Sequence, residues 1–353
     1  TRNPLAQAIL RYRGVNKLMS TYIRSSKGDD EGGLLGYSER DGRIHANQNI
    51  CGTVTGRFSS SGPNMQNNPR PGTTSQWGVN PRRWFIASEG RKLVVADMGQ
   101  AEVKVLALLS GDKDLIAAVN SGEDIHSEFA TACFGERFTC LDKDCEERKE
   151  LRLIAKTVVF GIMYGRGANS IAENLGLTVQ EAQEVIDSFF RRFPGVAAYI
   201  NRIAQQLNTN GEVRTLKGRP RRPVFATFPP PDEADRAMWN FAYFDEMKRA
   251  GIEEDESGDD YRNANARRGR ALRQGINSTI QGTVAELVND ALIELTEKGW
   301  DIVGQVHDEI ILDVPEDRVE EAERDLTEVL SREYGGVKFT ATAAHGDSWA
   351  DAK

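Results

Sequence analysis

Two apolar, strand-like segments that end at aspartates constrain the fold of this chain more than any other feature. Residues 92–96 have the composition of a buried strand, which ends at Asp97 where the chain turns toward a helix. Residues 301–306 and 309–314 form a second apolar pair, joined by a tight turn at Asp308. Because the two aspartates are remote in the sequence, only a folded sheet could bring them together. The sequence therefore predicts a sheet built from distant segments.

A pair of aspartates on such a sheet would suit divalent cations. Mg²⁺ is usually held by one or two carboxylates together with water and substrate phosphates. Two such ions, roughly 3.5–4 Å apart, stabilise the attacking and leaving oxygens of an in-line displacement. Aspartates at strand ends and turns are also common without any such role. Taken singly, Asp97 or Asp308 is better explained as an ordinary structural residue.

A helix predicted over residues 147–164 carries a more specific pattern. Arg152, Lys156, Phe160 and Tyr164 recur at every fourth position. Each step of four drifts by only ~40° around the helix, so the four side chains form one slanting stripe roughly 18 Å long. Two cations at one end suit a triphosphate, and two aromatic rings at the other suit a sugar and a base. An ordinary amphipathic helix is the alternative, but the apolar residues of this segment occupy other faces.

The loop over residues 55–67 could follow a nucleic-acid backbone. It combines small residues with Arg57 and the amides of Asn64 and Gln66. Such groups can contact sugar-phosphate oxygens and minor-groove acceptors. Loops of this composition usually have no such role, so the loop alone is a weak signal.

Composition limits the class of protein. The chain has 353 residues, a net charge of −8 and 39% hydrophobic residues, and it lacks an apolar run of the ~20 residues that a membrane span needs. With no secretory signal segment at its start, the expected compartment is cytoplasmic. An acidic balance argues weakly against nucleic acid, but basic clusters occur at residues 219–222 and 267–273. The four cysteines do not have zinc-ligand spacing and are expected to be reduced thiols.

Other segments complete the expected organisation. Helices are predicted at residues 4–24, 113–135, 267–298 and 316–333. Thr178 and Glu181 have the spacing of a capping box, which opens a helix that Pro194-Gly195 should close. Residues 226–266, with a proline run and an acidic stretch, are expected to be a solvated, partly mobile insertion without a catalytic role. Since the first residue is Thr1, we expect a fragment, a processed product or one piece of a split protein.

Taken together, these segments resemble the polymerase domain of family A DNA polymerases, the bacterial DNA polymerase I type. The matching motifs cover nearly the whole chain in the family's order. They are Thr55-Gly-Arg-Phe-Ser-Ser60 with Pro63-Asn-Met-Gln-Asn67, Ala96-Asp-Met-Gly-Gln-Ala-Glu102, the stripe from Arg152 to Tyr164-Gly165, Asn277-(x)3-Gln281-Gly-Thr283, and Gln305-Val-His-Asp-Glu309.

The resemblance implies an α+β fold, with an antiparallel palm sheet backed by helices and a helical fingers subdomain. The implied subdomains are the end of a thumb helix (1–30), the first part of the palm (31–114), the fingers (115–265) and the second part of the palm (266–353). The implied activity is template-directed DNA synthesis from deoxynucleoside triphosphates, in replication or repair. Most of the thumb and any exonuclease domain would lie outside this chain, and a separate amino-terminal chain could supply them.

The resemblance also implies a role for each motif residue. Two Mg²⁺ ions, or Mn²⁺, would be held by Asp97, Asp308 and the backbone carbonyl of Met98, with Glu309 as a supporting carboxylate. Nucleotide contacts would come from Arg152, Lys156, Phe160, Tyr164, Glu102 and Gln100. Within this set, Lys156 could protonate the leaving pyrophosphate, Phe160 would pack on the deoxyribose, Glu102 would exclude a 2′-hydroxyl, and Tyr164 would bracket the templating base. DNA contacts would come from Arg57, Asn64, Gln66, Arg273, Asn277, Gln281 and His307.

One motif departs from the family pattern. The family usually has Asp-Tyr-Ser-Gln-Ile-Glu where this chain has Met98, Gly99 and Ala101 at the second, third and fifth positions. Loss of the tyrosine ring should affect nucleotide selection. Two alternatives stay open: a single-subunit, phage-type RNA polymerase, and a non-catalytic nucleic-acid-binding relic. Glu102, Phe160 and Glu309 favour DNA synthesis over the first, and retention of Asp97, Asp308 and Lys156 argues against the second.

Overall fold

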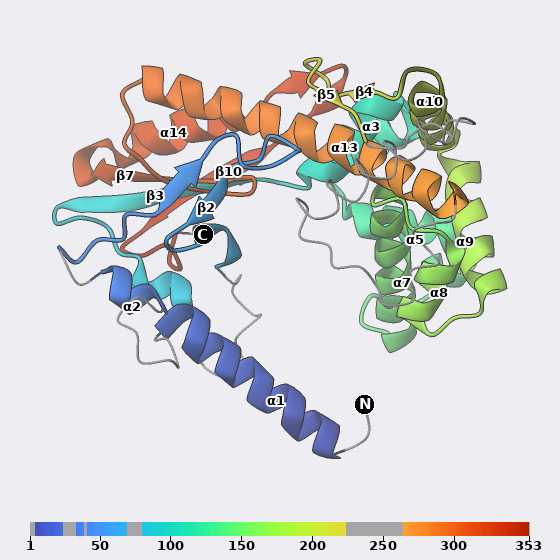
Figure 1. The fold of residues 1–353 in the computed structure, drawn as a ribbon, viewed down its shortest axis with the longest axis horizontal. Coiled ribbons are helices and arrows are strands. Elements are labelled where there is room, and N and C mark those ends of the chain that lie inside the picture. The colour runs from blue at the N-terminus through green and yellow to red at the C-terminus, as the bar shows by residue number, and fades with distance from the viewer. Residues whose placement is uncertain (1–3, 24–32, 39–40, 69–79, 224–263, 353) are drawn as a thin grey trace, which may run out of the picture. The chain divides into compact units, whose positions relative to one another are not determined.

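The computed structural model describes residues 4–23, 33–38, 41–68, 80–223 and 264–352 (Figure 1). Most of the insertion predicted at 226–266 therefore lies outside the described residues. The chain divides into two compact units. Unit 1 comprises Thr1–Gly99, Val288–Ser331 and Thr340–Lys353, and unit 2 comprises Gln100–Leu287 and Arg332–Phe339. The subdomain limits predicted at residues 30, 114 and 265 stay predictions.

Unit 1 is built on a four-stranded antiparallel sheet in the order β10-β3-β7-β6. The strands are β3 (Arg91–Met98), β6 (Ile302–Val306), β7 (Glu309–Pro315) and β10 (Ala341–Gly346). The β6-β7 hairpin turns at His307-Asp308, and β7 pairs with β3 along its whole length. The predicted α+β class with an antiparallel sheet is confirmed, as is the joining of remote segments.

Each face of this sheet has its own core because side chains alternate along a strand. Leu93, Val95 and Ile311 share one face in a buried cluster with Trp349, while Phe85 packs against its edge. Their neighbours in β3 and β7 point to the opposite face, where helix α14 (Val319–Leu330) packs against β3, β7 and β10. A 3₁₀ turn, η5 (Glu316–Arg318), precedes α14, so the helix predicted at 316–333 is shorter than expected.

Apart from α1 (Pro4–Leu18) and the end of the helix over residues 264–297, the remaining described elements of unit 1 are short. They are the π-helical η1 (Met19–Ile23), α2 (Gly33–Tyr37), the paired strands β1 (Asn47–Asn49) and β2 (Ser59–Ser61), and the 3₁₀ turns η2 (Met65–Asn67) and η4 (Pro81–Trp84). Leu18, Tyr22 and Leu34 form a small buried cluster, and the Tyr22 hydroxyl donates to the Asn67 carbonyl at 2.6 Å. The end of α1 is thereby fixed to the loop that follows β2.

Unit 2 is mainly helical (Figure 1). Its described helices before residue 224 are α3 (Ala101–Ser110), α4 (Lys113–Asn120), α5 (Ile125–Phe134), α6 (Glu136–Thr139), α7 (Glu146–Met163), α8 (Ala168–Leu175), α9 (Val179–Arg192) and α10 (Pro194–Asn210). Phe129, Phe189 and Phe193 pack edge-to-face or tilted at its centre. The capping box of Thr178 and Glu181 forms as predicted. Pro194, however, does not only end α9: it also occupies the first turn of α10, where a missing N–H costs nothing.

The long helix α13 (Ala264–Glu297) contributes to both units. In unit 2, its buried Glu286 accepts hydrogen bonds from the Thr215 hydroxyl at 2.5 Å and the Lys217 amide at 3.1 Å. These bonds fix the hairpin of β4 (Val213–Arg214) and β5 (Pro220–Arg221). A short ribbon of β8 (Glu333–Tyr334) and β9 (Val337–Lys338) completes this unit. Among the described helices, none is both long and apolar enough to cross a bilayer.

Candidate functional site

The structure brings Asp97 and Asp308 to neighbouring positions at one end of the unit 1 sheet. Asp97 is exposed although the four residues before it in β3 are buried. It pairs across the strands with Glu309, the residue that follows Asp308. The Met98 amide donates a hydrogen bond of 3.3 Å to the Asp308 carbonyl. The two predicted metal ligands therefore belong to one hydrogen-bonded corner of the sheet.

Left-handed backbone occurs beside both aspartates. Among the described non-glycine residues, Gln100 (φ 56°) and His307 (φ 59°) are those with positive φ. This conformation costs about 1–2 kcal/mol in an L-residue and persists only where surrounding contacts hold it. One residue lies three positions after Asp97 and the other immediately before Asp308. Such local strain is concentrated at functional sites in proteins generally.

Gln66 holds the turn that contains Asp308. Its side-chain oxygen accepts from the His307 amide at 3.0 Å, and its Nε2 donates to the Gln305 carbonyl at 2.8 Å. Asn64 caps the 3₁₀ turn η2 by accepting from the Gln66 amide at 3.0 Å. Both residues were predicted as DNA contacts, which stays a prediction. In the structure, the Gln66 side chain holds the His307-Asp308 turn directly, and Asn64 acts on it through the Gln66 amide.

Glu309 directs its carboxylate to two buried partners that the sequence reasoning missed. Both carboxylate oxygens accept from Nη1 of Arg82, at 2.9 and 3.0 Å, and Oε1 also accepts from the indole N–H of Trp349. Arg82, Glu309 and Trp349 are 4%, 6% and 1% exposed. No local pattern marks this group, because Arg82 and Glu309 are 227 positions apart.

The predicted stripe of Arg152, Lys156, Phe160 and Tyr164 forms on α7 and its C-terminal cap in unit 2. All four residues are half-buried, whereas Ala155, Val158 and Val159 are fully buried on other faces of the helix. The Lys156 ammonium lies 5.9 Å from the centroid of the Phe160 ring. The cationic and aromatic groups thus share one accessible surface of α7.

Arg152 has a partner that the sequence reasoning did not identify. Its Nε and Nη2 donate to the two carboxylate oxygens of Asp124, at 2.6 and 2.9 Å. The Arg152 guanidinium holds the pKa of Asp124 well below its usual range, and the pKa of Arg152 is raised in turn. Asp124 also caps α5 by accepting from the His126 amide. The cation proposed for phosphate binding is therefore paired with a carboxylate here.

His126 also belongs to this surface and was missed. Its ring centroid lies 5.9 Å from that of Phe160. Burial lowers the pKa of His126, and the charges of Lys156 and Arg152 lower it further, so the neutral imidazole is favoured. His126 lies two positions after Asp124, the cap of α5, and no motif of the sequence marks it.

Glu102, in the first turn of α3, is held by two other predicted site residues. Its Oε2 accepts from the Tyr164 hydroxyl at 3.0 Å, and its Oε1 accepts from Nε2 of Gln281 at 3.4 Å. Both carboxylate oxygens thus have partners on other helices of unit 2. Glu102 is presented in a fixed orientation, as a steric filter would require.

Arg273, Asn277 and Gln281 form a second stripe of four-residue spacing on α13. They interrupt a helix face that is otherwise largely buried between Ala271 and Val288. Gly165, at φ 66°, lies directly against this stripe: a Cβ there would be 2.6 Å from Cγ of Arg273. Glycine is required because α7 ends in close contact with α13. Arg57, the remaining predicted DNA contact, is half-buried in unit 1 beyond Thr53, whose hydroxyl donates to the Arg57 carbonyl.

The residues at the unit 1 corner fit Mg²⁺ bound jointly by protein and substrate. Within the described part of the chain, no group of three or more His, Cys, Asp or Glu side chains forms a complete metal cage. Mg²⁺ commonly uses one or two carboxylates and completes its shell with water and substrate phosphates. An exposed Asp97, the neighbouring half-buried Asp308 and a nearby main-chain carbonyl match that donor set.

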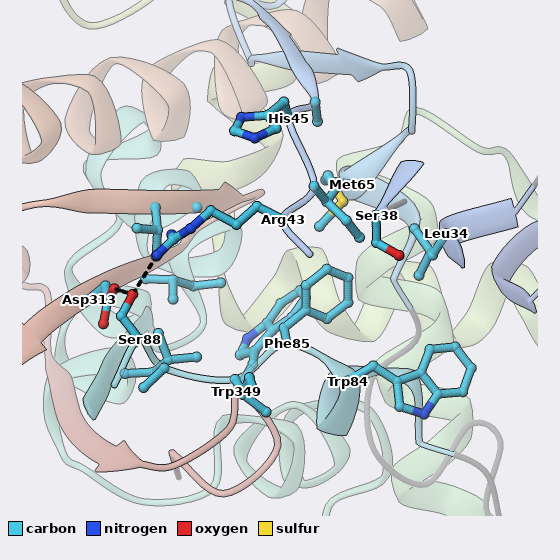
Figure 2. A pocket seen from close by; sticks show the side chains of 18 of the residues that line it. Leu34, Ser38, Arg43, His45, Met65, Trp84, Phe85, Ser88, Asp313 and Trp349 are labelled. Atoms are coloured by element: carbon cyan, nitrogen blue, oxygen red, sulfur yellow. Dashed lines mark hydrogen bonds between the residues drawn. The ribbon is translucent and has the colours of Figure 1, made fainter. Parts of the chain in front are cut away.

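A separate hollow of about 710 Å³ opens elsewhere in unit 1 (Figure 2). Leu34, Met65, Phe85 and Trp349 give it an apolar lining. On one side Arg43 donates to the Ser88 hydroxyl at 3.0 Å, which donates to Asp313 at 2.5 Å (Figure 2). Its described lining contains none of the predicted site residues. It does share Trp349 with the Glu309 group.

Comparison with known proteins identifies the family. The family model for DNA polymerase family A matches residues 1–351. DNA polymerase I of Chloroflexus aurantiacus is 38% identical over 354 residues, covering 98% of this chain and 32% of that protein. The thermostable DNA polymerase I of Thermus filiformis is 36% identical, covering 99% of this chain and 37% of that protein. This chain thus spans about a third of the length of these relatives.

A solved structure agrees with this result. It is the POL domain of Pol1 from M. smegmatis in complex with DNA primer-template and dNTP. The match has a TM-score of 0.76 at 28% identity and covers 100% of this chain and 54% of that one. The fold, the ordered motifs and the match over residues 1–351 together show that the chain belongs to DNA polymerase family A.

Proposed function

We propose that this chain is the catalytic portion of a template-directed DNA polymerase that adds deoxynucleotides to a primer 3′-hydroxyl. The observation that carries the proposal is the corner at which Asp97 and Asp308 meet, with the Met98 amide bonded to the Asp308 carbonyl. Membership of DNA polymerase family A supports it. Primer-template DNA and deoxynucleoside triphosphates are the proposed partners, as in the complex of the M. smegmatis domain.

Asp97 and Asp308, with the Met98 carbonyl, would hold two divalent cations, Mg²⁺ or Mn²⁺. Ions bound there would lower the pKa of the primer hydroxyl and offset charge on the leaving pyrophosphate. Asp97 lies on β3 and Asp308 in the turn that leads into its partner strand β7, so the spacing between their main chains is fixed before substrate arrives. Glu309 would support this site from its position beside Asp308, with its carboxylate bound to Arg82 and Trp349.

The α7 surface would bind the incoming triphosphate. Arg152 and Lys156 would contact phosphate oxygens, Arg152 after exchanging Asp124 for phosphate. The primer hydroxyl would lose its proton to solvent water as its oxygen bonds to the α-phosphorus. The bond from that phosphorus to the bridging oxygen would break, and Lys156 would give a proton to the departing pyrophosphate. The neutral His126 beside Phe160 would donate or accept a hydrogen bond at the same surface.

Glu102 and Phe160 would select the sugar. Phe160 would pack on the deoxyribose, and the Glu102 carboxylate, fixed by Tyr164 and Gln281, would meet a 2′-hydroxyl. A rigid carboxylate rejects ribose by overlap and by loss of its own hydrogen bonds. Gln100 would also contact the nucleotide, and Tyr164 would bracket the templating base. Primer and template would be contacted by Arg57, Asn64, Gln66, Arg273, Asn277, Gln281 and His307.

Primer extension tests the proposal directly. The purified chain should extend a labelled primer on a DNA template with Mg²⁺, and Asp308→Ala should lower the rate by at least about a hundredfold. Equal extension by both proteins would mean that the site is wrong or that the activity is a contaminant. Preference for ribonucleotides would establish the RNA polymerase alternative. DNA binding without extension by the wild-type chain would favour the relic.

A further inference from the structure

We propose that Arg82 sets the charge of the metal corner by holding Glu309 in a buried, neutral ion pair, so that the ions depend on Asp97 and Asp308. The inference rests on the proposed function only in taking those two aspartates as the metal ligands. All of the residues concerned lie in unit 1. In this reading Arg82 and Trp349 are positioning residues, since they act on the site through Glu309.

The first support is the burial of the Glu309 carboxylate. Nη1 of Arg82 donates to both carboxylate oxygens of Glu309, and the Trp349 indole donates to one of them. The Arg82 and Glu309 side chains are only 5% and 8% exposed. A carboxylate buried to this extent must be paired or coordinate a metal. Here its hydrogen-bonding capacity is directed to Arg82 and Trp349.

The second support is the charge at the corner. Asp97 and Glu309 are direct cross-strand partners, so their side chains leave the same face of the sheet. Like charges in that arrangement repel each other, and Asp308 adds a third carboxylate one residue away. Arg82 supplies the compensating cation at Glu309 specifically. Without Arg82, the negative charge of all three carboxylates would be uncompensated, and the corner would hold divalent ions more tightly.

The third support is that packing holds the Arg82 guanidinium in place. Its guanidinium carbon lies 4.1 Å from the centroid of the Trp349 ring, and that ring packs edge-to-face on Phe85 with centroids 5.6 Å apart. The Trp349 amide donates to the Phe85 carbonyl at 2.9 Å. Arginine suits this place because its planar, weakly hydrated group can stack on an aromatic ring while it donates to a carboxylate.

Binding of Mn²⁺ alone provides a test that does not depend on polymerase activity. Free Mn²⁺ would be measured by electron paramagnetic resonance with the purified chain, without nucleotide or DNA. An Asp97→Asn/Asp308→Asn double variant gives the background. Arg82→Met, which removes the cation, should tighten binding on the order of tenfold. Glu309→Gln, which leaves Arg82 uncompensated, should weaken it by a similar factor.

Three further variants separate charge from structure. The double variant Arg82→Met/Glu309→Gln restores neutrality and should return Mn²⁺ affinity to the wild-type value. Arg82→Lys keeps the charge and should also bind as the wild type does. Trp349→Phe removes one neutral donor, so it should lower the melting temperature and leave Mn²⁺ affinity unchanged.

The outcomes are decisive in either direction. Single-charge variants that bind Mn²⁺ as the wild type does, or an Arg82→Met variant that binds it more weakly, would overturn the inference. If Arg82→Met does not fold, Glu309→Gln and Arg82→Lys decide the question alone. A wild-type chain that binds Mn²⁺ at the aspartates but extends no primer would contradict the proposed function and not this inference. If the wild type extends a primer but the charge variants bind Mn²⁺ as the wild type does, the proposed function stands and this inference is contradicted.

Discussion

The Met98 amide donates a hydrogen bond to the Asp308 carbonyl, which joins the end of β3 to the β6-β7 turn. Met98 follows Asp97 directly, so one main-chain contact ties together the two segments that carry the proposed metal ligands. A main-chain bond of this kind is insensitive to side-chain identity. This explains how Met98 can stand at a position where the family usually has tyrosine without loss of the corner.

Sugar selection should depend on the hydrogen bonds of Glu102. Glu102→Ala removes the group proposed to exclude a 2′-hydroxyl and should lower the preference for dNTP over NTP by about 10²-fold or more. Tyr164→Phe removes only one donor to Glu102 and should lower it by about fivefold to tenfold, the equivalent of about 1–1.5 kcal/mol. The measurement is kcat/KM for matched dNTP and NTP in primer extension. Unchanged selectivity in Glu102→Ala would contradict the assignment.

Release of Arg152 from Asp124 should favour triphosphate binding. Asp124→Ser removes the carboxylate but keeps a side-chain oxygen that can cap α5. Both members of the pair are about 40% exposed, and exposed ion pairs contribute about 0.2–1 kcal/mol, so KM for dNTP should fall by at most about fivefold. The matched control is Asp114→Ser, which breaks an exposed pair with Arg192 that links α4 to α9 and does not involve Arg152. A rise in KM for Asp124→Ser alone would mean that Asp124 orients Arg152 productively.

The pKa of His126 should report the charge of the α7 surface. Burial lowers it first, and Lys156 and Arg152 lower it further, from an ordinary value of 6.5. Lys156→Met should therefore move the pKa upward. The four histidines of the chain make an NMR titration of ¹³C-labelled imidazoles practical. A downward shift in Lys156→Met, or a wild-type pKa above 6.5, would contradict the structure.

The same shift has a consequence for stability. The folded state binds the proton of His126 less well than the unfolded state does. Above about pH 6.5 His126 is neutral in both states and does not lower the free energy of unfolding. Stability is lost as the pH falls from that value toward the folded pKa. Thermal melts of the wild type and of His126→Gln between pH 5 and pH 8 (about the range over which histidine titrates) should diverge only at the acidic end.

Close contact of α7 with α13 should make Gly165 intolerant of a side chain. In Gly165→Ala, the new Cβ would lie 2.6 Å from Cγ and 2.9 Å from Cα of Arg273, at φ 66°. Left-handed strain and overpacking together should cost about 2–4 kcal/mol of unfolding free energy. Gly167→Ala is the control, since φ there is −91° and its Cβ would meet nothing within 4 Å, so about 1 kcal/mol or less is expected. Equal destabilisation of the two variants in denaturant melts would rule out the contact.

Local sequence patterns predicted the elements that position the site. The run before Asp97 became β3, the pair around Asp308 became the β6-β7 hairpin, and the four-residue spacing from Arg152 to Tyr164 lies on one helix. Each of these signals lies within a short segment of the sequence, where the spacing of apolar residues and the choice of turn residues determine local structure.

The missed features depend on contacts between remote residues. Arg82 and Trp349 lie in segments with no motif of their own, and their pairing with Glu309 arises only when η4, β7 and the C-terminal segment meet. The pairing of Arg152 with Asp124 likewise requires α5 to pack on α7. The position of Arg152 in the four-residue pattern can thus be recognised from the sequence, whereas its pairing with Asp124 cannot.

The pairing of Asp97 with Glu309 makes the proposed chemistry depend on strand register at the resolution of a single residue. A one-residue deletion within β3 would rotate every later side chain of that strand to the opposite face. The carboxylate would then enter the helix-covered side of the sheet, and the buried Met98 side chain would take its outward place. Such a deletion would abolish the corner while leaving the length, composition and helices of the chain almost unchanged.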